Sequence, residues 1–223
     1  MMQGKLIVME GIDGSGKSTQ YQRLCQRLSE EGRAYRKAVF PRYDQDSSAL
    51  IRSYLGGQFG DKPEDVNAYA ASTFFAVDRF AAYKTDWGAY YDRGGLVLAD
   101  RYTTSNACHQ GSKLPAAERQ PFLDWLYDFE FRLMGLPKPA LVLYLDIDVD
   151  TARRQMARRQ SATHTQADIH ERDFAYLASC LEMGHYAAEH YGWTRIPCTR
   201  DGALRGVEEI HQEIYEAVCG ALS

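Results

Sequence analysis

The sequence predicts an α/β fold of three layers, in which helices cover both faces of a five-stranded parallel sheet. Short apolar runs recur between longer segments whose apolar residues have helical spacing. The apolar runs are continuous rather than alternating, as expected for parallel strands that are buried on both faces. The 223 residues contain no linker, repeat or low-complexity tract, so we expect one domain over residues 1–223.

Five apolar runs are expected to form the strands of this sheet. They are Leu6–Met9, Ala38–Phe40, Leu96–Ala99, Leu141–Leu145 and Thr194–Pro197. Residues 63–92 are predicted to be largely helical, because Pro63 and the two acids after it suit a first helical turn. Residues 207–222 repeat apolar residues at helical spacing and are predicted to form a helix against the core.

The turn after the first apolar run contains a complete G-x4-G-K-S pattern at residues 11–18. Its glycines let the backbone fold around an anion, so that successive N–H groups and the next helix N-terminus point at it. The pattern predicts a P-loop NTPase fold with a nucleoside triphosphate site. Lys17 would reach the β- and γ-phosphates, and the Ser18 hydroxyl would bind Mg²⁺. The expected ATP-binding residues are Gly11, Ile12, Asp13, Gly14, Ser15, Gly16, Lys17, Ser18 and Thr19.

Charged residues stand at the ends of predicted strands, where ligands bind in such folds. Asp100 ends the third strand, and we expect its carboxylate to hold Mg²⁺ directly or through water; a helix cap is the alternative. Arg42 and Arg101 follow the second and third strands, and Arg79 lies on the helix between them. A guanidinium can bind a phosphate through two N–H groups, so these three predict a second anion site. Surface ion pairs are the alternative for each of them.

A cluster of arginines follows the fourth predicted strand. Its members are Arg153, Arg154, Arg158 and Arg159. We interpret residues 153–172 as a lid that brings positive charge over the γ-phosphate, with a solvated helix face as the alternative. Asp168 and Glu171, in the same segment, are candidates for a helix cap or a substrate contact.

The composition excludes several classes of protein. A net charge of −4 with mixed signs gives no basic stripe for a polynucleotide. Five cysteines without a C-x-x-C pair suit reduced thiols in the cytoplasm, and no histidine pair has zinc-ligand spacing. No apolar run approaches the length of a membrane span or a signal peptide core, so we expect neither a membrane nor an export address.

Together, four groups of residues strongly resemble the thymidylate kinase family, and the resemblance runs nearly from end to end. They are residues 10–20, Phe40-Pro41-Arg42-Tyr43, Phe75 with Asp78-Arg79, and Asp100-Arg101-Tyr102 with Ser105-Asn106. The last group discriminates best, because many NTPases share the phosphate loop alone. The resemblance implies a nucleoside monophosphate kinase-like fold, and a homodimer built from helices.

The family resemblance also implies how the nucleobase would be bound. Phe75 would stack on the thymine ring, Arg79 would donate a hydrogen bond to a base carbonyl, and Asn106 would approach the base edge. An aromatic shelf with a few polar contacts is also what a pyrimidine needs physically.

The same resemblance assigns the sugar and the acceptor phosphate. Asp13 would hold the 3′-hydroxyl, and Tyr43 would line the pocket near the phosphate. Arg101 would clamp the phosphate, with Arg42 as a weaker candidate. These roles agree with the second anion site that the strand ends predict.

Two positions depart from the family pattern. Some members carry an arginine in the phosphate loop where this chain has Gly14, so the arginines of the lid segment would supply the transition-state charge instead. His109 stands where several bacterial relatives have a tyrosine near the sugar, which bears on the preference for deoxyribose over ribose.

We therefore predict an ATP:dTMP phosphotransferase in which positioning and electrostatics carry the reaction. The expected catalytic residues are Lys17, Asp100, Arg101, Arg153 and Arg158. A kinase for another nucleotide remains the nearest alternative, since one methyl group discriminates by only about 1–3 kcal/mol. A GTP-dependent switch would need an N-K-x-D motif, which the sequence lacks. A regulator without catalysis is the third alternative.

Overall fold

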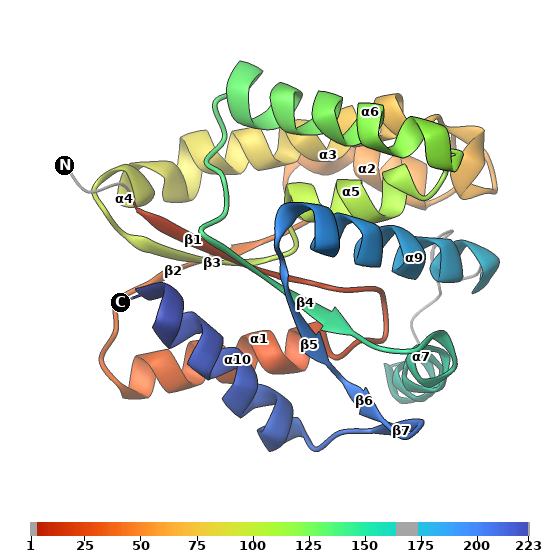
Figure 1. The fold of residues 1–223 in the computed structure, drawn as a ribbon. Helices are drawn as coiled ribbons and strands as arrows, with labels where there is room; N and C mark the ends of the chain where they lie inside the picture. Colours follow the sequence, from red (N-terminus) through yellow and green to blue (C-terminus); the bar gives the residue numbers. More distant parts are fainter. Residues whose placement is uncertain (1–3, 164–173, 223) are drawn as a thin grey trace.

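A five-stranded parallel sheet forms the centre of the molecule (Figure 1). The computed structural model describes residues 4–163 and 174–222. The strands follow the order β2-β3-β1-β4-β5, with every neighbouring pair parallel. Their bounds are β1 (Lys5–Glu10), β2 (Arg36–Val39), β3 (Leu96–Asp100), β4 (Leu141–Asp146) and β5 (Thr194–Pro197). The predicted fold class is confirmed.

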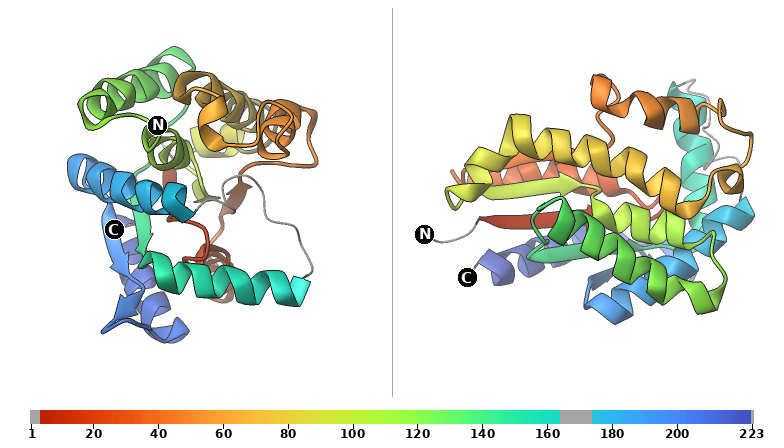
Figure 2. Two further views of the ribbon diagram at one scale, coloured as in Figure 1. Left: turned by 90° about the vertical axis from the view of Figure 1, so that its right-hand side faces the viewer. Right: turned by 90° about the horizontal axis from the view of Figure 1, so that it is seen from above.

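Helices cover both faces of the sheet (Figure 2). The layer on one face holds α1 (Lys17–Glu30) and α10 (Val207–Leu222). The helices toward the other face are α2 (Ala49–Leu55), α3 (Ala68–Ala82), α4 (Gly88–Asp92), α5 (Thr103–Gly111), α6 (Ala116–Tyr127) and α9 (Phe174–Tyr191). The predicted helical region 63–92 is confirmed, and it also contains the 3₁₀ turn η2 (Pro63–Asp65) and the π-helical turn η3 (Tyr83–Trp87).

Four shorter or separate elements complete the chain. They are the 3₁₀ turn η1 (Asp46–Ser48), the π-helical turn η4 (Asp128–Leu133), the helix α7 (Val149–Thr163) and the hairpin of β6 (Thr199–Arg200) with β7 (Ala203–Leu204). The helix α7 lies beyond the carboxyl end of β4 (Figure 1). No helix among the described residues is both long enough and apolar enough to span a membrane.

The two faces of the sheet bury two separate hydrophobic clusters. Successive strand residues point to opposite faces. In β1, Leu6 and Val8 therefore pack with Phe122 of α6, whereas Ile7 packs with Ile214 of α10. This arrangement explains the continuous apolar runs of the sequence. In sheets of this kind, ligands bind beyond the carboxyl ends of the strands.

Candidate active site

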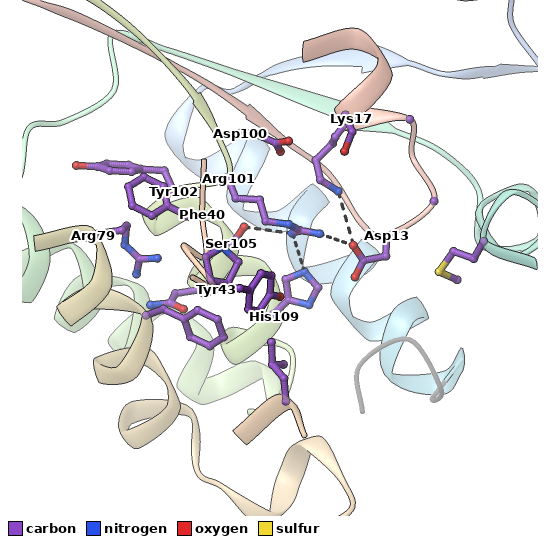
Figure 3. Close-up of a pocket in the computed structure, with 18 of the residues that line it drawn as sticks. Asp13, Lys17, Phe40, Tyr43, Arg79, Asp100, Arg101, Tyr102, Ser105 and His109 are labelled. Carbon is purple, nitrogen blue, oxygen red and sulfur yellow. Dashed lines mark hydrogen bonds and ion pairs between the residues drawn. The ribbon is translucent and has the colours of Figure 1, made fainter. Parts of the chain in front are cut away.

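A cavity of about 520 Å³ opens at the carboxyl edge of the sheet (Figure 3). The phosphate loop, the ends of β2 and β3, and side chains of α3, α5 and α7 all contribute to its wall. Most of the residues expected at the site line it. They are Asp13, Gly14, Gly16, Lys17, Ser18, Thr19, Tyr43, Phe75, Arg79, Asp100, Arg101 and Asn106.

The phosphate loop has the backbone that its glycines predict. Gly14 and Gly16 have φ values of 82° and 87°, in the left-handed region that favours glycine. Lys17 is the first residue of α1, and its Nζ donates to the carbonyl oxygens of Gly11 at 2.6 Å and Ile12 at 2.9 Å. Burial, and then the nearby Arg101, lower the pKa of the Lys17 ammonium. The ammonium is thus held at the cavity by its own loop.

The loop packs closely against the first turn of α7. A Cβ atom built on Gly14 would lie 2.3 Å from the carbonyl oxygen of Ala152. No side chain fits there with the backbone in place. The local packing therefore explains why this position is a glycine and not the arginine that some thymidylate kinases carry.

Arg101 occupies the centre of a polar network between the loop and α5. It has a φ of 66°, unusual for a residue with a side chain. One end of its guanidinium pairs with Asp13, while Nη1 lies 3.3 Å from Ser105 Oγ and 3.3 Å from His109 Nε2 (Figure 3). Burial alone would lower its pKa, but Asp13 and Glu10 outweigh burial and raise the pKa above its ordinary value. The guanidinium therefore stays charged.

Glu10, at the end of β1, also belongs to this network. Its side chain is fully buried and accepts hydrogen bonds from the Gly11 N–H at 2.9 Å, Thr104 Oγ1 at 2.8 Å and Ser105 Oγ at 2.7 Å. It also lies 3.5 Å from Arg101. One carboxylate thus fixes the start of the phosphate loop to the start of α5.

Asp100 presents a carboxylate to the cavity beside Lys17 (Figure 3). Burial raises the pKa of this carboxyl, and the positive charges of Lys17 and Arg101 act against that rise. Within the described part of the chain, no group donates a hydrogen bond to it. A carboxylate oxygen and the hydroxyl of Ser18, which lines the same cavity, are hard ligands of the kind that suit Mg²⁺. The described residues contain no cluster of three His, Cys, Asp or Glu that could hold a metal ion.

The aromatic end of the cavity lies between α3 and α5. Phe75 packs its ring edge-on to Tyr54, with the centroids 6.3 Å apart. Arg79 is 2% exposed and forms a two-pronged ion pair with Glu130, while Asn106 donates to the Ser72 carbonyl oxygen at 3.0 Å. An apolar ring beside fixed polar groups suits a flat heterocycle.

Six of the expected residues do not line the cavity. Three of them, Gly11, Ile12 and Ser15, belong to the phosphate loop but not to the cavity wall. Arg42 donates to Asp78, with Nε 3.1 Å from Oδ1, and so faces α3. Arg153 and Arg158 are exposed on α7, whose contribution to the cavity wall comes from Gln155 and Met156. Residues 164–172 of the predicted lid, with Asp168 and Glu171, and the side chain of Arg159 lie outside the described residues.

Sequence reasoning missed two residues of the site. Glu130 lies in the π-helical turn η4, and no motif marks it. Gln110 lines the cavity from α5, and neither polar atom of its buried amide has a hydrogen-bond partner within the described segments. Gln110 lies about one helical turn after Asn106 on α5, so this spacing was the available signal.

Comparisons with known proteins agree on one family. The family model described as thymidylate kinase matches residues 9–214. A thymidylate kinase of Mycobacterium tuberculosis is 36% identical over 172 residues, which cover 75% of this chain and 78% of that protein. The thymidylate kinase of Homo sapiens is 31% identical over 211 residues, covering 95% and 88%. The solved thymidylate kinase of Candida albicans superposes with a TM-score of 0.70 at 19% identity, over 98% of this chain and 92% of that one.

Proposed function

This chain belongs to the thymidylate kinase family, and we propose that the cavity at the carboxyl edge of the sheet binds ATP on the phosphate loop and dTMP between α3 and α5. The chain is an ATP-dependent phosphotransferase that converts dTMP to dTDP. One observation carries the assignment of the sites. The same cavity joins Lys17, on the phosphate loop, to a second cation, Arg101, that lies toward the aromatic end.

On the nucleotide side, Lys17 would exchange the two carbonyl oxygens of its loop for the β- and γ-phosphates of ATP. Ser18 and Asp100 are the residues that would hold Mg²⁺. When bound, that ion would supply positive charge to the transferring phosphoryl group. The buried position of Lys17 strengthens its interaction with the phosphates, since little water competes.

On the acceptor side, Phe75 would stack on the thymine ring, and Arg79 and Asn106 would bind its polar edge. Arg101 would hold the phosphate of dTMP in line with the γ-phosphate, because its guanidinium is fixed and charged. Arg42 is the second candidate for that phosphate.

Two further side chains complete the acceptor site. Asp13 would accept a hydrogen bond from the 3′-hydroxyl of the sugar. Tyr43, which is 52% exposed, would line the pocket beside the phosphate and cover it from the solvent side.

The transition-state charge would come from α7. Arg153 and Arg158 lie on this helix, whose first turn touches the phosphate loop at Gly14. Residues 153–172 would act as the lid that places these charges over the γ-phosphate.

Four wider properties complete the proposal. The single five-stranded sheet supports one domain over residues 1–223. The exposed Tyr69 and Val77 on α3 support a homodimer through helices. Five free cysteines support a reducing cytoplasm, and the negative net charge argues against a polynucleotide partner.

The test is ADP formation from ATP and Mg²⁺ with dTMP, dUMP, UMP, dCMP, AMP, GMP and thymidine as acceptors. We expect rapid turnover with dTMP, and its loss in Lys17→Ala. Lys37→Ala, which alters an exposed lysine on β2, serves as the control. If no acceptor stimulates ATP consumption, the acceptor site is assigned wrongly and a nucleotide-binding regulator becomes the better description.

A further inference from the structure

Glu130 is a fully buried carboxylate behind the aromatic end of the cavity. It accepts hydrogen bonds from Arg79 Nε at 2.7 Å and Arg79 Nη2 at 2.5 Å, from Thr103 Oγ1 at 2.7 Å and from Asn106 Nδ2 at 3.3 Å. One side chain on η4 therefore binds two polar residues that line the cavity, Arg79 and Asn106.

These contacts fix the orientation of the Asn106 amide. Its nitrogen lies 3.0 Å from the Ser72 carbonyl oxygen and 3.3 Å from the Glu130 carboxylate. Both partners only accept hydrogen bonds, so the atom between them must be the NH₂ group. The amide oxygen accepts no hydrogen bond from any described residue. Asn106 therefore offers the cavity an acceptor.

The same carboxylate also fixes the orientation of Arg79. Two of its five N–H groups point to Glu130. Within the described ranges, the Nη1 group donates to no partner, and Arg79 lines the cavity. The base end of the site thus presents donors from α3 beside an acceptor from α5.

We propose that Glu130 is a positioning residue that sets the selectivity of this site for a base with an imide edge. Thymine and uracil present an N–H between two carbonyl oxygens, which pairs with an acceptor beside donors. Cytosine presents a ring nitrogen acceptor and an amino group there, so both contacts become repulsive. The inference rests on the proposed function and deepens it.

A carboxylate group enforces this arrangement of donors and an acceptor at the base end of the cavity. It has acceptors only, so every neighbour must turn a donor toward it. A purely structural contact would not need this charge, because a well-packed apolar pair is often as stable as a buried ion pair.

The test is the variant Glu130→Gln, which keeps the volume but replaces one carboxylate oxygen with an NH₂ group. Four donors from Arg79, Thr103 and Asn106 then face a single acceptor oxygen and a new donor, so the orientation of Arg79 and Asn106 is no longer enforced. We expect the ratio of kcat/KM for dTMP to that for dCMP to fall at least about tenfold. The KM for ATP should not change, because the phosphate loop is untouched.

Thr103→Val is the matched control, since it removes one hydrogen bond to the same carboxylate but leaves Arg79 and Asn106 in place. We expect its dTMP to dCMP ratio to change less than about threefold. If Glu130→Gln lowers both activities by the same factor, the role of Glu130 is only structural and the inference is overturned.

If Glu130→Gln does not fold, Glu130→Asp gives the same test. It keeps the charge but withdraws the carboxylate from Arg79 and Asn106, so the ratio should again fall, and an unchanged ratio overturns the inference. Wild-type protein that does not phosphorylate dTMP would instead overturn the proposed function itself.

Discussion

Arg42 Nε lies 3.1 Å from Asp78 Oδ1, which joins the turn after β2 to the middle of α3. The Asp78 carboxylate is 1% exposed and also accepts from the Arg42 backbone N–H at 2.9 Å and from Ser47 Oγ at 2.6 Å. The turn that carries Arg42 is therefore held by a buried acceptor, and its guanidinium has a partner without any ligand.

The two candidate phosphate arginines should differ when each is replaced by lysine. Arg101→Lys loses the two-pronged head group at the cavity, and we expect kcat/KM for dTMP to fall about 10- to 100-fold. Arg42→Lys loses bonds to Asp78, and we expect about 1 kcal/mol lower stability with a change in kcat/KM below about threefold. Steady-state kinetics and urea unfolding check both. A larger kinetic loss in Arg42→Lys would move the phosphate clamp to Arg42.

Asp100→Asn should make the protein more stable and less active. Burial raises the pKa of this carboxyl, so the folded state binds its proton more tightly than the unfolded chain does. Stability then falls as the pH rises through the interval between the ordinary value and the raised one. Asn removes this penalty, so we expect higher stability at pH 7, a flatter pH profile, and kcat reduced about 10- to 100-fold with weaker Mg²⁺ dependence.

Asp128→Asn is the control for that experiment, because its effect on stability should have the opposite sign. Arg132 holds the pKa of the exposed Asp128 below its ordinary value through a hydrogen bond. Its ionisation therefore stabilises the fold, and the effect is lost as the pH falls. We expect a slight loss of stability at pH 7 and normal activity. If both variants change the free energy of unfolding in the same direction, the assigned direction of one of the two pKa shifts is wrong.

Gly14→Ala should damage the phosphate loop more than its backbone angle alone explains. Gly14 and Gly32 have φ values of 82° and 70°, but a Cβ meets nothing within 4 Å at Gly32. Gly32→Ala should therefore cost about 1–2 kcal/mol, the price of the left-handed conformation. Gly14→Ala adds the collision with Ala152, so we expect a larger loss of stability and of kcat. Urea unfolding of the two variants measures the difference, and equal losses would show that α7 yields freely.

Arg158→Ala should lower kcat without lowering stability. Arg158 is exposed on α7, so its removal leaves no buried group unpaired. If it stabilises the transferring phosphoryl group, kcat should fall about 10- to 100-fold while the KM for dTMP changes little. Arg93→Ala, also exposed but distant from the cavity, is the control. Unchanged kcat in Arg158→Ala would remove this residue from the mechanism.

The strands and the phosphate loop were predictable because each rests on local sequence. Continuous apolar runs mark strands that are buried on both faces, and the glycine spacing fixes the loop geometry. The predicted bounds of the second strand, Ala38–Phe40, were the least accurate. It is an edge strand that pairs only with β3 and exposes Arg36 and Lys37. Its observed bounds, Arg36–Val39, therefore extend into polar residues that no apolar run reveals.

The side-chain partners could not be predicted, because they join distant parts of the chain. Glu130 and Arg79 are 51 positions apart, and a π-helical turn sets which residue of η4 faces inward. A helical repeat read from sequence assumes 3.6 residues per turn and misplaces such a residue. The pairing of Arg42 with Asp78 could not be predicted either. The two residues are 36 positions apart, and an arginine after a strand suggests a phosphate ligand as readily as an ion pair.

Asp13, which belongs to the phosphate loop, and Arg101, which follows β3, form an ion pair with each other. A phosphate that binds to Arg101 must compete with Asp13, whose carboxylate also lies 4.0 Å from Lys17 Nζ. Occupation of the acceptor half therefore alters the electric field that the donor nucleotide meets. By thermodynamic linkage, each substrate must change the affinity of the other by the same factor. If Arg101 binds the acceptor phosphate, we therefore expect the two binding equilibria to be coupled through the Asp13 carboxylate.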